Sequence, residues 1–209
     1  GGEGSFGGDS VFSEETLAQN GTGATSKKPA DTQAARGDSG IDPSDTQGGR
    51  DQQSFAQVED ALSGMSGESM AADELLRHIV TRVTDEGLIV ELFDLPGEAL
   101  FESGTDTPTQ IMIDLADMVA GVFGLVDNDI ALNGFVRSRP VVLANNPVWD
   151  LSLARADRVR LLLQGAEVAA PRIQRITGSA DRVPVARNLM ALRNNRVELI
   201  LLRRDPRQQ

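Results

Sequence analysis

The alternation of hydrophobic and polar residues predicts a β-hairpin near the start of the apolar part of the chain. Residues 80–83 and 88–93 have the composition of strands, and an Asp-Glu-Gly sequence typical of a turn separates them. Residues two apart in a strand share a face, so the second strand has one wholly apolar face. The residues of that face are Leu88, Val90 and Leu92.

Apolar residues that recur at spacings of three and four predict two long helices, over 108 to about 123 and over about 151–165. Thr107 is a suitable N-cap for the first of them, and Pro108 suits its first turn. The residues expected to face the core are Ile111, Leu115, Met118, Val119 and Val122 in the first helix, and Ala156, Val159, Leu162 and Leu163 in the second.

Shorter segments complete the pattern. An apolar stripe predicts a helix over 53–68, and weaker signals predict short helices over 69–79 and 187–192. Strands are expected over 130–134, 173–177 and 196–202, and the last is apolar on both faces, which is typical of a central strand. This order predicts an α+β or α/β sandwich, in which helices pack on one face of a mixed β-sheet.

Composition divides the chain into a polar first part and a folded second part. Residues 1–70 contain 13 of the 21 glycines and 12 acidic against 4 basic residues, with apolar residues only singly or in pairs. Such a segment buries too little apolar surface to offset its chain entropy. We therefore expect a flexible acidic linker over 1–52, linker helices over 53–79 and a folded domain over 80–205. Within the linker, residues 9–19 are expected to form a short amphipathic helix against a partner.

Several functional classes are disfavoured by composition. An isoelectric point near 4.5 argues against nucleic acid as the main partner, and the chain has no cysteine. Its single histidine, His78, is expected to be an ordinary helix residue, and no cofactor or metal site is indicated. No apolar run is long enough to span a bilayer and no signal peptide is present, which predicts a cytosolic protein or a piece of a longer chain. No catalytic set can be assembled, so we expect binding rather than catalysis.

Charge is unevenly distributed within the folded part. Residues 71–136 contain 13 acidic and 2 basic residues, whereas residues 137–209 contain 6 acidic residues and 14 arginines. The protein can therefore present one acidic and one arginine-rich face. Alternatively, the two halves interleave and the charges mix.

Arg155 is the clearest candidate for ligand binding. It lies about one turn into the helix that starts after Trp149, so its guanidinium can reach a groove beside the irregular stretch 135–147. A planar guanidinium suits a carboxylate ligand. The alternative is that Arg155 caps a strand end or pairs with an acid.

The motifs around Arg155 resemble those of the OmpA-like peptidoglycan-binding family, in the version found in MotB flagellar stator proteins. The resemblance covers roughly residues 80–203, and the Gly-rich tail with Ser-Val-Phe-Ser at 10–13 favours the MotB branch. The motifs that carry it are Leu-Ser-x-x-Arg-Ala at 151–156 after Trp149, Asn-Asn-Arg-Val-Glu at 194–198, Phe-Glu-Ser-Gly at 101–104, and Arg-Ile-Thr-Gly at 175–178 ahead of Pro184.

The resemblance implies an OmpA-like sandwich whose Arg155 faces the carboxylate of diaminopimelate in the peptide stem. The family's Gly-His-Thr-Asp turn, whose aspartate faces the ammonium, is Gly-Phe-Val-Arg here, so Arg137 reverses that charge. Arg137, Arg139 and Arg155 would then favour carboxylates of the stem, and Asp150 could supply the missing negative charge. The expected peptidoglycan-binding residues are Arg155, Leu151, Ala156, Arg137, Asp150, Asn194 and Arg196.

The resemblance also implies a place in the cell. It predicts the periplasmic part of a homodimeric stator subunit that anchors an ion-conducting MotA/MotB complex to peptidoglycan and is not an enzyme. An N-terminal membrane helix, absent from this sequence, would tether it to the inner membrane. Residues 9–19 would correspond to the family's plug, and the P-ring or other basal-body proteins are possible partners. The alternative is an OmpA-like interaction adaptor or dimerisation domain that does not bind the wall.

Overall fold

A computed structural model describes residues 43–140 and 147–204 of the chain, with side chains from residue 48 onward. The predicted linker up to residue 42, with its segment 9–19, lies outside the described residues. The domain boundaries placed at 52 and 79 therefore stay predictions.

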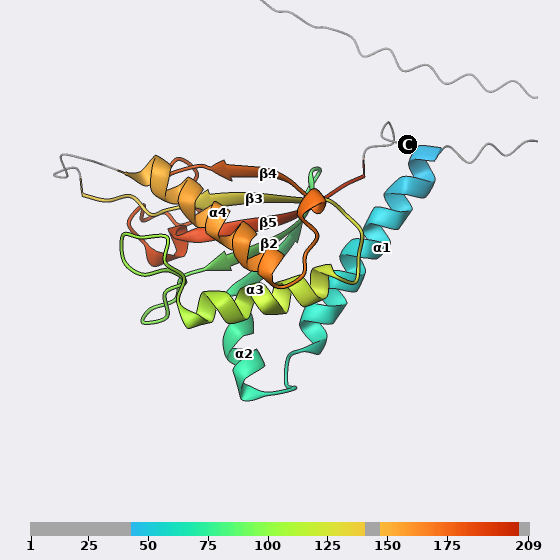
Figure 1. Cartoon of the computed structure of the whole chain (residues 1–209), viewed down its shortest axis with the longest axis horizontal. Coiled ribbons are helices and arrows are strands. Elements are labelled where there is room, and N and C mark those ends of the chain that lie inside the picture. The colour runs from blue at the N-terminus through green and yellow to red at the C-terminus, as the bar shows by residue number, and fades with distance from the viewer. Residues whose placement is uncertain (1–42, 141–146, 205–209) are drawn as a thin grey trace, which may run out of the picture. The chain divides into compact units, whose positions relative to one another are not determined.

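A five-stranded mixed sheet forms the centre of the fold, in the order β1-β2-β5-β3-β4 (Figure 1). The β3–β4 pair is parallel and the other neighbouring pairs are antiparallel. The predicted hairpin and the central position of the last strand are both confirmed. The strands are β1 Ile79–Val83, β2 Gly87–Phe93, β3 Ile130–Phe135, β4 Ile173–Gly178 and β5 Arg196–Leu202.

Helices cover one face of this sheet, as the predicted α+β sandwich requires. In Figure 1, α3 (Gln110–Phe123) and α4 (Val148–Gly165) lie on the same side of the strands, and α1 (Pro43–Gly64) runs beside α3. The short helix α2 (Met70–Leu76) follows α1. Apolar residues of these helices pack against β2, β3 and β5 in one core that includes Leu88, Val90, Leu92, Val119, Val159 and Leu199.

Helix α1 begins at Pro43, ten residues before the predicted start, and ends at Gly64. The predicted apolar stripe is helical, and Phe55, Val58 and Leu62 are buried in the main core. Tertiary packing thus stabilises a helix whose own sequence, with Gly48 and Gly49, is a weak helix former.

Two local predictions are wrong. Helix α3 starts at Gln110, because Pro108 pairs with Phe101 in a β-bridge and Thr109, not Thr107, caps the helix. Residues 187–192 do not form a helix. The side-chain amide of Asn194 donates to the carbonyls of Asn188 and Leu189, and such bonds compete with helical ones. A 3₁₀ turn, η2, occupies Leu192–Asn194 instead.

His78 lies beyond the end of α2 rather than within a helix. Its ring is buried, with Nδ1 2.8 Å from the carbonyl oxygen of Phe93 and Nε2 3.2 Å from Glu98. These contacts join the residues after α2 to the end of β2 and to the loop that follows it. The histidine side chain therefore helps to hold these segments together.

The two halves of the folded part interleave, so their charges mix. Because β5 lies between β2 and β3, arginines from the second half meet acids from the first. The ion pairs of this kind are Arg193–Glu91, Arg196–Glu91, Arg158–Asp106 and Arg175–Glu86.

Candidate functional site

A pocket of about 660 Å³ lies where the chain leaves β2 and β3 and where α4 begins. Segments far apart in the sequence form its walls, and four elements supply the polar side chains. The polar lining residues are Asp94 after β2, Ser103 in the following loop, Arg137, Ser138 and Arg139 after β3, Arg155 on α4, and Asn195 before β5.

Two glycines allow α4 to approach the sheet closely enough to reach this pocket. A Cβ at Gly134 of β3 would lie 2.0 Å from the carbonyl oxygen of Ser152, and one at Gly178 of β4 would lie 2.6 Å from the amide nitrogen of Leu153. The Ser152 hydroxyl also accepts a hydrogen bond from the amide of Ala180, at 3.0 Å. These contacts fix the first turns of α4 on the sheet, and Arg155 follows one turn later.

Arg155 is held at the pocket wall by the loop before α3. Only 6% of the residue is exposed. Its Nε donates to the carbonyl of Thr105 at 3.0 Å, its Nη2 donates to that of Glu102 at 3.4 Å, and its guanidinium lies 4.9 Å from the centroid of the Phe101 ring. Burial lowers the pKa of the guanidinium, while Asp94 acts in the opposite direction. Since arginine stays protonated in proteins, this is a fixed positive charge.

Asp94 is the acid of this pocket, and the sequence patterns did not single it out. Burial raises the pKa of its carboxyl, against the opposing effects of hydrogen bonds from Leu100 and Asn195 and of the charges on Arg155 and Arg137. The Leu100 amide donates at 2.9 Å and the Asn195 side chain at 2.8 Å. The only sequence signal was its place directly after a buried strand, where functional side chains often lie.

Asn195 connects the buried acid to the pocket rim. Its Nδ2 donates to Asp94, and its Oδ1 accepts from the backbone amide of Arg137 at 2.8 Å. The Arg137 side chain is exposed, and its Nη1 donates to the carbonyl of Met190 at 3.4 Å. The backbone at the rim is thus held in place, while the Arg137 side chain faces solvent.

Unpaired positive charge is concentrated in this pocket. Within the described part of the chain, seven arginines form no ion pair with a carboxylate, and three of the seven line this one pocket. The three are Arg137, Arg139 and Arg155. Such an arrangement suits a ligand that carries carboxylates.

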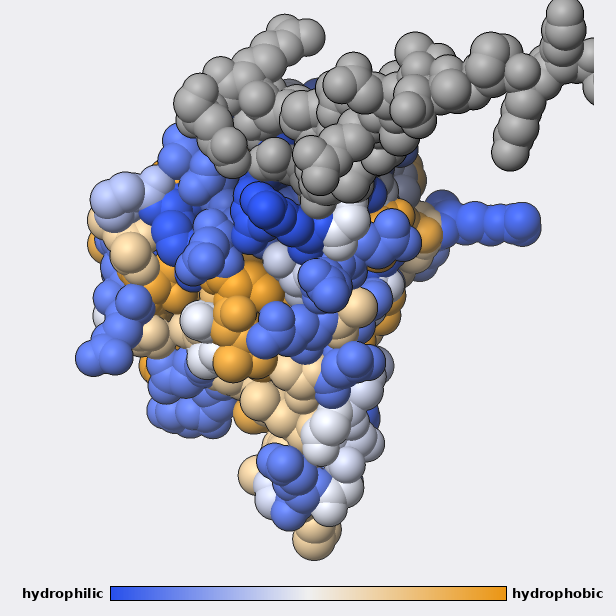
Figure 2. All heavy atoms as spheres, turned by 90° about the vertical axis from the view of Figure 1, so that its right-hand side faces the viewer, coloured by the Kyte–Doolittle hydropathy of each residue, from blue (hydrophilic) through white to orange (hydrophobic). Residues whose placement is uncertain are grey.

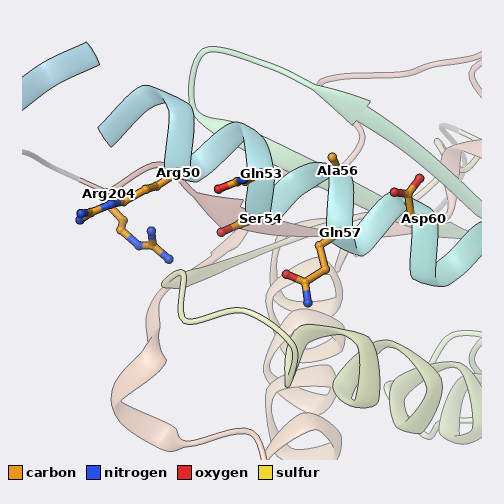
Figure 3. A pocket seen from close by; sticks show the side chains of 7 residues that line it. All are labelled: Arg50, Gln53, Ser54, Ala56, Gln57, Asp60 and Arg204. Atoms are coloured by element: carbon orange, nitrogen blue, oxygen red, sulfur yellow. The ribbon is translucent and has the colours of Figure 1, made fainter. Parts of the chain in front are cut away.

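A second groove, of about 560 Å³, lies along α1 and is polar (Figure 3). Its labelled side chains come from α1 and from Arg204, which follows β5. The surface on the α1 side of the molecule is largely hydrophilic, with hydrophobic atoms in a strip between polar ones (Figure 2). Buried Asp51, next to Arg50 on α1, accepts hydrogen bonds from the Asn128 side chain at 3.1 Å and from the Arg204 amide at 3.0 Å. Arg204 therefore both lines this groove and takes part in a contact that holds α1 on the domain.

The described residues show neither a metal cluster nor a membrane span. No three His, Asp or Glu side chains among them are grouped so that they could hold a metal ion. Likewise, no helix in the described ranges is both long and apolar enough to cross a membrane.

Comparison with known proteins finds a similar curated protein. No protein-family model matches the sequence. Motility protein B of Escherichia coli is 24% identical over 154 residues, which are 70% of this chain and 50% of that protein. The chain thus spans about half the length of the curated relative.

Solved structures agree with this match. The periplasmic domain of Helicobacter pylori MotB superposes with a TM-score of 0.53 and 24% identity, covering 62% of this chain and 84% of that one. The cell wall anchor of the T6SS from Pseudomonas aeruginosa is 27% identical, with a TM-score of 0.53 and coverage of 65% and 94%. The chain contains a MotB-like domain. The fold expected from the sequence motifs is therefore confirmed.

The MotB-like domain brings together three of the seven predicted site residues. Arg137, Leu151 and Arg155 line the pocket. Asp150, expected to supply a negative charge there, is exposed on α4 and is not part of the lining. The acid found in the lining is Asp94.

The other three predicted residues of this MotB-like domain do not line the pocket. Ala156 is fully buried in the main core. Asn194 is buried, and its Oδ1 accepts from two consecutive backbone amides, those of Val185 and Ala186, so it holds the preceding loop.

Arg196 lies on the face of the sheet opposite the helices. Its Nε is 3.2 Å from Glu198 and 3.7 Å from Glu91, and its guanidinium is 3.6 Å from the centroid of the Phe135 ring. Burial lowers its pKa, against the effect of the two glutamates. Arg196 is thus the centre of a buried ion cluster. It does not line the large pocket, but it lines a small adjacent cavity together with Asp94, Arg155 and Asn195.

Proposed function

We propose that this MotB-like domain anchors a flagellar stator to peptidoglycan through the arginine-lined pocket. The observation that carries the proposal is the gathering of Arg137, Arg139 and Arg155 around one cavity without carboxylate partners. Peptide stems of the wall present carboxylates, and guanidinium groups bind carboxylates strongly. The similarity to motility protein B and to a cell wall anchor supports the same function.

The wider proposal follows the MotB relatives. The domain lies in the periplasm as part of a homodimer, and a membrane helix outside this sequence pairs with MotA. Residues 9–19 form the plug, the rest of 1–52 is the linker, and the P-ring or other basal-body proteins are further contacts. The role is structural rather than catalytic, as the likeness to motility protein B suggests.

Co-sedimentation with isolated sacculi tests the anchoring. We expect the 209-residue chain to pellet with sacculi and Arg139→Glu to pellet several-fold less. Arg187→Glu is the matched control, because Arg187 is an exposed arginine without an ion pair among the described residues and lies outside the pocket. Equal loss in both variants would show a non-specific effect of net charge and would contradict the pocket as the anchor.

The adaptor alternative gives a different outcome in the same assay. A chain that stays in the supernatant with sacculi, yet binds another flagellar protein in a salt-sensitive way, would be an interaction module on this fold. That result would replace the anchoring proposal.

A further inference from the structure

We infer that the pocket selects a ligand group that carries carboxylates and no ammonium. This inference rests on the proposed function, and it specifies the ligand chemistry of the same site. To bind a zwitterionic group, a pocket must present a cation and an accessible anion side by side.

The pocket offers positive charge from two segments, the stretch after β3 and helix α4. Arg155 projects from α4 and is fixed by the carbonyls of Glu102 and Thr105. Arg139 lies against the same loop, since its Nη2 is 3.6 Å from the position that a Cβ on Gly104 would occupy. Arg137 lies at the rim, beside Met190. A ligand that enters therefore meets three guanidinium groups.

Asp94 does not supply an accessible anion. Only 6% of the residue is exposed, and each of its carboxylate oxygens already accepts a hydrogen bond. Its negative charge is also already compensated by Arg155 and Arg137, whose positive charges act to lower the pKa of its carboxyl. An ammonium group would have to compete with these contacts, and it would meet Arg137 at the rim.

Arg139 and Arg137 both repel the charge of Arg155. Burial is the main cause that lowers the pKa of the Arg155 guanidinium, and the charges of Arg139 and Arg137 act in the same direction, against those of Asp94 and Asp106. An anion reduces this repulsion, whereas a zwitterion brings a further positive charge. The expected ligand is thus a peptide-stem terminus whose free groups are carboxylates.

Two synthetic stem tripeptides separate the possibilities. The first is L-Ala-γ-D-Glu ending in meso-diaminopimelate, and the second ends in 2-aminopimelate, which keeps the distal carboxylate but lacks the distal amine. We expect the 209-residue chain to bind the second about tenfold more tightly, equivalent to about 1.4 kcal/mol. Arg137→Asp should reverse the preference, and Arg187→Asp should leave it unchanged.

The outcomes distinguish this inference from the proposed function. Tighter binding of the diaminopimelate peptide by the unsubstituted chain, or an unchanged preference in Arg137→Asp, overturns the inference and leaves wall anchoring intact. Binding of sacculi without binding of either peptide also overturns it. An Arg137-dependent preference for the deaminated peptide without sacculus binding supports the ligand chemistry and rejects the wall anchor.

Discussion

Replacing Gly134 with alanine tests the close contact that carries Arg155 to the pocket. The added Cβ would lie 2.0 Å from the Ser152 carbonyl oxygen and 3.3 Å from the Cβ of Ala156. Ordinary van der Waals contact begins near 3.4 Å, so α4 and β3 must separate by about 1.4 Å. A backbone carbonyl within a helix cannot rotate away as a side chain can.

The expected cost lies at the upper end of the usual range for overpacking, about 3 kcal/mol of unfolding free energy. Gly121→Ala is the matched control. Gly121 lies on the exposed face of α3 with no atom within 4 Å of its would-be Cβ, so alanine should stabilise the protein by about 0.5–1 kcal/mol. Replacement of glycine by alanine is thus expected to destabilise the protein at position 134 and to stabilise it at position 121.

Urea unfolding followed by far-UV circular dichroism measures both changes. Fluorescence of Trp149, the only tryptophan and a residue of the first turn of α4, reports whether that helix has moved. Gly134→Ala should also weaken ligand binding, because Arg155 moves with α4. If Gly134→Ala cost less than about 0.5 kcal/mol, or if Gly121→Ala were the more damaging change, the reasoning would be refuted.

Three further changes test other parts of the fold, each by urea titration. Asp51→Ala should lose about 2–3 kcal/mol, because the buried Asn128 amide and the half-buried Arg204 amide lose their acceptor, whereas Asp60→Ala on the exposed side of the same helix should change stability by less than about 0.5 kcal/mol. Arg196→Met should cost about 1.5–3 kcal/mol, since two buried glutamates lose a cation while Arg193 still pairs with Glu91 and Arg82 with Glu198; a cost below about 0.5 kcal/mol would mean that the cluster is not stabilised by that charge. The pKa of Asp94 is raised above its ordinary 3.8 in the folded state, so its contribution to stability is greatest below 3.8 and falls as pH rises through the raised value. The stability of the parent relative to Asp94→Asn should therefore decrease from acidic to neutral pH, and an increase would contradict the raised pKa.

The strands and long helices were predictable because their patterns are local. Strand β5 has consecutive buried positions, and such a run is itself the mark of a strand covered on both faces. The start of α3 was misjudged by two residues because Pro108, a common first residue of helices, here pairs with Phe101. That pairing depends on a neighbouring segment, which no local pattern contains.

The site was less predictable than the fold. Arg155 and Arg137 were predicted from their positions in sequence motifs. Asp94 could be recognised as a site residue only from the folded structure, in which the ends of β2 and β3 and the start of α4 lie around one pocket. The burial of Arg196 was not predictable, because alternation along a strand gives the face of a residue but not what covers that face. Its burial depends on Glu91, more than a hundred residues away in the sequence.

The most direct test of the arginine-lined pocket as the wall-binding site is a nuclear magnetic resonance titration. Soluble peptidoglycan fragments, released from sacculi by a muramidase, are added to the isotope-labelled 209-residue chain, and backbone amide shifts are followed. The account predicts that the largest changes occur at Asp94, in 101–105, in 137–139 and around Arg155, and that they disappear in Arg139→Glu but persist in Arg187→Glu. Changes centred on the polar groove of α1, or no changes at all, would contradict it.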